Sequence, residues 1–139
     1  MTDAEFLAAL ESGVLPEADF NHAGHVRAAW LYLRQCPFPE ALARMSGALR
    51  NYAAAHGKPD RYHETITVAY LALINERILL RSAGGSWQGF IEQNHDLLDR
   101  RLLTHYYRPE TLASPTARRV FILGEFRDPP YGGSAQARQ

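Results

Sequence analysis

The chain has little cysteine and no excess of charge of either sign. Cys36 is its only cysteine among 139 residues, so the sequence offers neither a disulfide framework nor a cysteine-based zinc site. Basic and acidic residues number 15 each, and the formal net charge is zero. A general nucleic-acid-binding protein needs a basic excess to displace counterions from the phosphate backbone. We therefore expect no nucleic-acid partner.

Long apolar runs and strand-like alternation are also missing. No apolar stretch approaches the roughly 20 residues that a membrane-spanning helix requires, so we expect no membrane partner. The N-terminal segment Met1–Glu5 is acidic and lacks the basic and apolar regions of a signal peptide. These absences lead us to expect a soluble cytoplasmic protein. The period-two alternation of half-buried strands does not persist anywhere, and there is no internal repeat.

The sequence does contain segments of helical periodicity, bounded by residues that typically start and stop helices. Helices are expected to begin near Thr2, at His22, near Pro39, near His63, at Trp87 and after Ser114. Capping residues support these starts: a capping box of Thr2 with Glu5, and Asn21 and Ser86 as N-caps. Asn94 is interpreted as a further cap that restarts the fifth helix, and Gly57 as the stop of the third.

These elements predict an all-α fold, a compact up-down bundle of five to six helices within a single domain, residues 1–127. From residue 128 the chain is rich in Pro, Gly, Ser and Gln, which predicts a flexible, disordered tail over 128–139. The longest apolar segment is the fourth helix, from about His63 to Leu80. Because it is apolar nearly all round, we expect it to be buried on most sides.

The up-down topology predicts that the histidines converge. Short connections make consecutive helices antiparallel neighbours. The second and fourth helices then start at the same end of the bundle at which the third and fifth helices finish. Five of the six histidines are then expected at that end: His22, His25, His56, His63 and His95.

This convergence suggests a metal site. His22 and His25 are three residues apart, so their side chains sit ~60° apart around the helix axis and can face one ion. His63 would add a third nitrogen ligand, and Glu64 or Glu92 an oxygen. Such a set suits one divalent transition metal: Zn, Fe, Mn or Ni. With an open coordination position that activates water or oxygen, the protein would be a metal-dependent enzyme with Glu64 as ligand or general base.

Two other interpretations stay open on the same residues. Helix N-termini favour bound anions and disfavour imidazolium, so the alternative is a metal-free module whose pocket binds a small carboxylate or phosphate. Alternatively, the histidines only satisfy buried backbone groups of a structural protein, with a homodimer as one form of it. Glu92 and His95 have the Glu-x-x-His spacing of di-metal carboxylate bundles, but one copy does not favour a di-metal site.

Three motifs resemble those of a family of small uncharacterised bacterial α-helical proteins. They are Phe-x-His-x-x-His, Tyr-His-Glu-Thr and Tyr-Tyr-x-Pro-Glu-x-Leu, found here at Phe20–His25, Tyr62–Thr65 and Tyr106–Leu112. The resemblance covers most of the chain and implies no activity, since none is known for the family. It marks His22, His25, His63 and Glu64 as motif positions. The family often carries proline where this chain has His95, which implies a helix break near Asn94 and argues against His95 as a ligand.

Overall fold

The computed structural model describes residues 1–80 and 85–126. Within these residues it contains seven α-helices, four short 3-10 helices and no strand, which confirms the all-α class. The predicted tail, 128–139, lies outside the described residues. No helix in the described part of the chain has the length and apolar character needed to cross a membrane.

The α-helices are α1 (Asp3–Glu11), α2 (His22–Gln35), α3 (Phe38–Ala55), α4 (Glu64–Leu80), α5 (Trp87–Gln93), α6 (Pro109–Leu112) and α7 (Pro115–Arg119). The 3-10 helices are η1 (Glu17–Asp19), η2 (Pro59–Arg61), η3 (His95–Leu98) and η4 (Leu102–His105). The six expected helices are present, with α6 in addition.

Local hydrogen bonds at the helix ends account for most of these boundaries. The Thr2 hydroxyl accepts from the Glu5 N–H at 3.1 Å, and the Thr2 N–H donates to the Glu5 carboxylate at 3.2 Å, which confirms the capping box. The Asn21 side chain caps α2 by accepting from the Gly24 N–H at 3.0 Å. Gly57 follows α3 with φ of +71°, the left-handed conformation that ends many helices.

Asn94 does not act as the predicted cap. Its side chain is fully buried, and its amide donates to the Phe90 carbonyl at 2.9 Å. The same side chain accepts from the Arg77 guanidinium at 3.3 Å. A buried amide must satisfy its donors and its acceptor inside the protein, and here these partners lie on α4 and α5 instead of the following turn.

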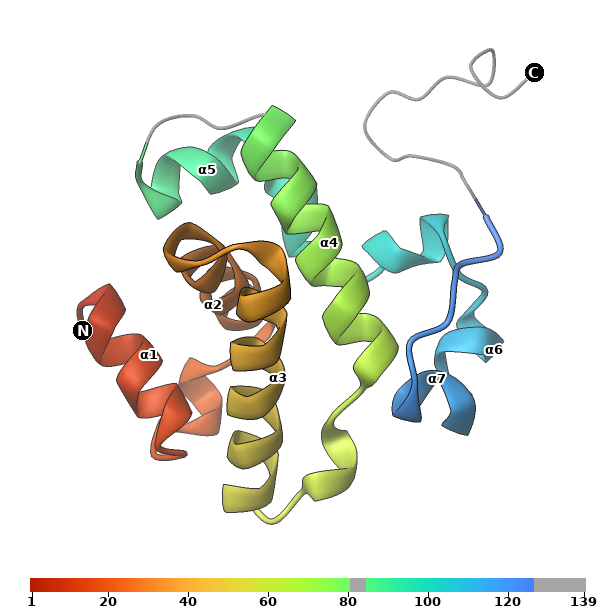
Figure 1. Ribbon diagram of the computed structural model, residues 1–139, viewed down its shortest axis with the longest axis horizontal. Coiled ribbons are helices and arrows are strands. Elements are labelled where there is room, and N and C mark those ends of the chain that lie inside the picture. Colours follow the sequence, from red (N-terminus) through yellow and green to blue (C-terminus); the bar gives the residue numbers. More distant parts are fainter. Residues whose placement is uncertain (81–84, 127–139) are drawn as a thin grey trace.

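Helices α2, α3 and α4 pack against one another and form the centre of the molecule. Figure 1 shows α1 and α4 on opposite sides of α3, α6 and α7 on the far side of α4, and α3 and α4 running in opposite directions. The short α5 packs against η3 and is not a fourth long antiparallel member of a bundle. The antiparallel arrangement is therefore clear for α3 and α4, and the C-terminal third does not continue it.

Helix α4 is less buried than its composition predicts. Leu79 and Leu80 in its last turn are 84% and 61% exposed. Helix α4 packs against α2, α3 and α7, and its last turns reach past the start of the antiparallel α3 in Figure 1. Apolar character all round the helix therefore does not translate into burial along its whole length.

The C-terminal segment is pinned to the start of α4 by one buried hydroxyl. Thr65 is fully buried, and its hydroxyl donates to the Val120 carbonyl at 2.9 Å and accepts from the Ile122 N–H at 3.2 Å. Tyr107 adds a second bond, from its hydroxyl to the Ile122 carbonyl at 2.7 Å. These hydrogen bonds fix the backbone around Val120 and Ile122, which belongs to no helix.

We expect Thr65→Val to lower the free energy of unfolding by about 1–3 kcal/mol, because it leaves backbone groups without partners while keeping the side-chain volume. Chemical denaturation monitored by circular dichroism measures this change. The matched control is Thr67→Val, because the Thr67 hydroxyl donates to the His63 carbonyl at 2.8 Å, one turn earlier, and not to the described C-terminal segment. Equal losses for both variants would contradict the pinning role.

Candidate functional site

A pocket of about 250 Å³ lies where the starts of α2 and α4 meet the end of α3 and η2. Its lining falls into an aromatic wall, a charged mouth and an apolar floor. The wall is Phe20, His25, Tyr52 and His56; the mouth is Glu17, Lys58 and Arg61; the floor includes Leu49 and Ile66.

Four rings in series form the aromatic wall. The His25 ring stacks on Phe20 with centroids 4.1 Å apart, and Tyr52 meets Phe20 edge-on at 4.9 Å. His56 continues the series at 4.3 Å from Tyr52. The Tyr52 hydroxyl donates to the Leu15 carbonyl at 2.8 Å, which fixes the middle of the series.

The mouth of the pocket carries two cations that share one carboxylate. The Lys58 ammonium donates to both Glu17 oxygens at 3.0 and 3.2 Å, and the Arg61 guanidinium donates to one of them at 3.2 Å. The Lys58 hydrogen bond is the main cause of a lowered pKa for Glu17. The three side chains leave one positive charge in excess, and all keep contact with solvent.

His63 uses both of its ring nitrogens inside the protein. Its Nδ1 accepts from the Ile66 N–H at 3.1 Å, so the side chain acts as the N-cap of α4. A backbone N–H can only donate, so Nδ1 is the unprotonated nitrogen and Nε2 carries the proton. Nε2 then donates to the Leu112 carbonyl at 2.6 Å. No ring lone pair is left for a metal in this arrangement.

His22 and His25 have different environments although they share a helix turn. The His22 Nε2 donates to the Leu97 carbonyl at 3.0 Å, and its ring meets Tyr70 edge-on. The His25 ring makes no hydrogen bond within the described residues; the residue is exposed and its ring lines the pocket. His25 is therefore the predicted ligand whose nitrogens remain available to a bound molecule.

Both imidazoles have a pKa below the ordinary value, as expected for neutral rings, but the main cause differs from the expected one. Desolvation by the surrounding protein lowers the pKa of His25 to about 4, and the nearby charges of His22 and Arg100 add to it. Desolvation also lowers the pKa of His22. Desolvation is thus the main cause of both lowered pKa values, although His25 as a whole residue is exposed and His22 is half-buried.

The described residues do not assemble the predicted metal site. They contain no group of three or more His, Cys, Asp or Glu side chains that could hold a metal ion. His25 and His63 do line one pocket, but the ring nitrogens of His63 are committed to Ile66 and Leu112. The structure thus gives no support to a Zn, Fe, Mn or Ni ion held by His22, His25 and His63.

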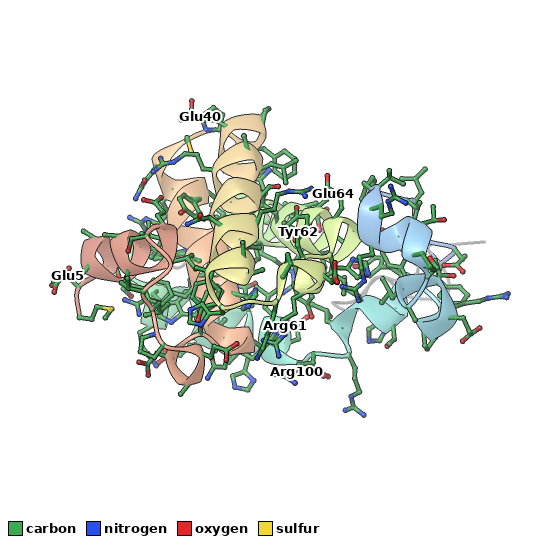
Figure 2. All side chains as sticks on the ribbon, turned by 90° about the horizontal axis from the view of Figure 1, so that it is seen from below. Glu5, Glu40, Arg61, Tyr62, Glu64 and Arg100 are labelled. Atoms are coloured by element: carbon green, nitrogen blue, oxygen red, sulfur yellow. The ribbon has the colours of Figure 1, made fainter. Side chains whose placement is uncertain are left out.

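Glu64 lies beside the pocket but does not line it. The Tyr62 hydroxyl donates to its carboxylate at 2.5 Å, and the Arg50 guanidinium lies 3.7 Å away. Figure 2 shows Glu64 and Tyr62 on one side of the α4 start and Arg61 on the other. Glu64 is therefore placed to orient Tyr62, and the role of general base has no geometry to support it.

Of the two other histidines that were expected at this end, one lines the pocket and one does not. His56 joins the pocket, and the buried edge of its ring, Nε2, has no hydrogen-bond partner among the described residues. His95 and Glu92 are exposed and do not line the pocket. The mouth residues Lys58 and Arg61 were not among the predicted site residues. The sequence feature that could have indicated them is a pair of basic residues in the short connection between α3 and His63.

Comparison with known proteins finds no match: no protein-family model, no curated protein and no solved structure matches the chain. The resemblance to small bacterial helical proteins therefore stays a prediction.

We expect His63→Ala to lower the free energy of unfolding by about 1–3 kcal/mol, because it removes a helix cap and leaves the Leu112 carbonyl without its donor. His63→Asn keeps an acceptor for the Ile66 N–H and should recover part of the loss. Urea denaturation measures both variants. A His63→Ala protein as stable as the wild type would contradict the capping role.

Acidification tests His25. The pKa of His25 in the folded protein lies below the ordinary value of about 6.5. Between the two pKa values, His25 is protonated in the unfolded chain but neutral in the folded protein. Its contribution to stability is therefore complete above about pH 6.5 and is lost as the pH falls towards about 4. The loss is smaller than for a fully buried histidine, because the ring keeps contact with solvent.

We expect His25→Gln to flatten this decline of the melting temperature between pH 7 and pH 4, measured by differential scanning calorimetry. The control is His105→Gln, at a histidine of η4 that does not line the pocket, measured over the same pH range. Identical profiles for wild type and His25→Gln would show that His25 does not titrate in this range.

Proposed function

We propose that the protein is a metal-free binding module for a small organic anion, held in the pocket between α2, α3 and α4. The observation that carries the proposal is a cavity of about 250 Å³ with an aromatic wall and two cations at its mouth. Ligand sites in proteins combine a mainly apolar lining with a few placed polar groups. This pocket has both parts.

The positive charge at the mouth of the pocket favours an anionic ligand. Lys58 and Arg61 share the single carboxylate of Glu17, so the mouth has one positive charge to offer. Arg61 is 65% exposed along its side chain, and surface ion pairs contribute little to stability. An incoming anion can therefore share or replace Glu17 at low cost, and Arg presents a planar fork of donors that matches a carboxylate.

The histidines support a binding role more than a purely structural one. A structural role accounts for His22 and His63, since each donates to a distant backbone carbonyl. It does not account for His25, which faces the pocket without a partner among the described residues. A neutral imidazole there offers a ligand both a donor and an acceptor.

Binding should appear as thermal stabilisation by small carboxylates such as butyrate or benzoate, with a melting temperature that rises with ligand concentration. Lys58→Gln combined with Arg61→Gln should weaken the affinity at least about tenfold, because charge-assisted hydrogen bonds contribute about 1.5–3 kcal/mol. Isothermal titration calorimetry measures the affinity.

Arg119→Gln is a control, because Arg119 is an exposed cation on α7 that does not line the pocket. It should bind the acids like the wild type. The proposal fails if no small anion raises the melting temperature, or if Arg119→Gln weakens binding as much as the pair of mouth substitutions.

A further inference from the structure

A second, smaller cavity lies beside the pocket, deeper between α2, α3 and α4. Its volume is about 70 Å³, and it shares His25, Leu49, Ile66 and Thr67 with the lining of the first. The part that is not shared is mostly aliphatic: Val26, Ala29, Met45, Leu71 and Ile74. The two cavities are therefore neighbours with opposite character, one charged at its mouth and the other apolar.

Apart from the His25 ring, the polar side chains around the smaller cavity each donate a hydrogen bond to a backbone carbonyl. The Tyr70 hydroxyl donates to the Asp99 carbonyl at 3.0 Å, and the Thr67 hydroxyl to the His63 carbonyl at 2.8 Å. His22 donates to the Leu97 carbonyl. A water molecule needs two to four polar partners to be held in a cavity, so this space favours an apolar occupant.

His25 stands between the two cavities. It lines both, and its ring stacks on Phe20 but makes no hydrogen bond within the described residues. Rotamer changes of exposed side chains take picoseconds to nanoseconds. Because His25 is an exposed residue that lines both spaces, a turn of its ring would widen the connection between the charged pocket and the apolar cavity on that timescale.

We propose that the ligand is a monocarboxylic acid with an unbranched apolar tail, whose carboxylate binds Lys58 and Arg61 and whose tail passes His25 into the apolar cavity. This inference rests on the proposed anion-binding function and names its ligand class. The single positive charge left at the mouth suits a monoanion better than a doubly charged phosphate. The aliphatic lining of the inner cavity suits a hydrocarbon chain.

The test is a series of straight-chain acids, acetate, butyrate, hexanoate and octanoate, with dissociation constants from isothermal titration calorimetry. Each methylene that enters the cavity should strengthen binding about fourfold, so hexanoate should bind about 16-fold more tightly than butyrate. The gain should end once the cavity is full. Inorganic phosphate should bind more weakly than hexanoate.

Ala29→Leu tests where the tail lies. Ala29 is only 3% exposed and lines the inner cavity but not the outer pocket, so a larger side chain there fills the tail space. The ratio of hexanoate to butyrate affinity should fall from about 16 to about 1 in this variant. Ala29→Val makes the same test with a smaller addition if Ala29→Leu does not fold. Ala54→Leu, on the exposed face of α3, should keep the wild-type ratio.

The outcomes separate this inference from the proposed function. Short acids that bind with no dependence on chain length would overturn the tail site and leave anion binding intact. Tighter binding of phosphate than of hexanoate would overturn the ligand class. An unchanged hexanoate ratio in a folded Ala29 variant would place the tail elsewhere. If no acid or phosphate binds at all, the proposed function itself is wrong.

Discussion

One imidazole ties the candidate site to the rest of the fold. His63 caps α4 through Nδ1 and holds the Leu112 carbonyl through Nε2, so a single side chain fixes both the first turn of α4 and the C-terminal elements packed against it. Both bonds exist together only for the neutral tautomer protonated at Nε2. The pocket wall that α4 provides depends on this arrangement, because Ile66, the residue whose N–H is capped, lines the pocket.

The division of labour among the histidines follows from their hydrogen bonds. His22 and His63 each donate to a carbonyl far away in sequence and so join separate segments. His25 and His56 instead lie in a series of stacked rings beside the cations at the mouth. His22 and His63 therefore join distant segments although each also lines one of the two cavities, whereas His25 and His56 form part of the aromatic pocket wall.

Local signals predicted the helices well. Thr2, Asn21 and Ser86 cap the helices at which they were expected, because each bond closes within three residues. Asn94 has the same local appearance, but Arg77 and the Phe90 carbonyl occupy its side chain. A polar side chain at a helix boundary has several competing partners, and the sequence does not show which of them the packing brings near.

The sequence by itself determined the all-α class, the starts of α1 to α4 with histidines at two of them, and the end of α3, because periodicity and caps act over a few residues. Tertiary structure decided what those histidines do. The bond from His63 to Leu112 spans 49 residues, and that from His22 to Leu97 spans 75. Such contacts depend on how α4 and the C-terminal elements pack. In these contacts His22 and His63, two of the predicted metal ligands, are hydrogen-bond donors, and His25 lines the pocket.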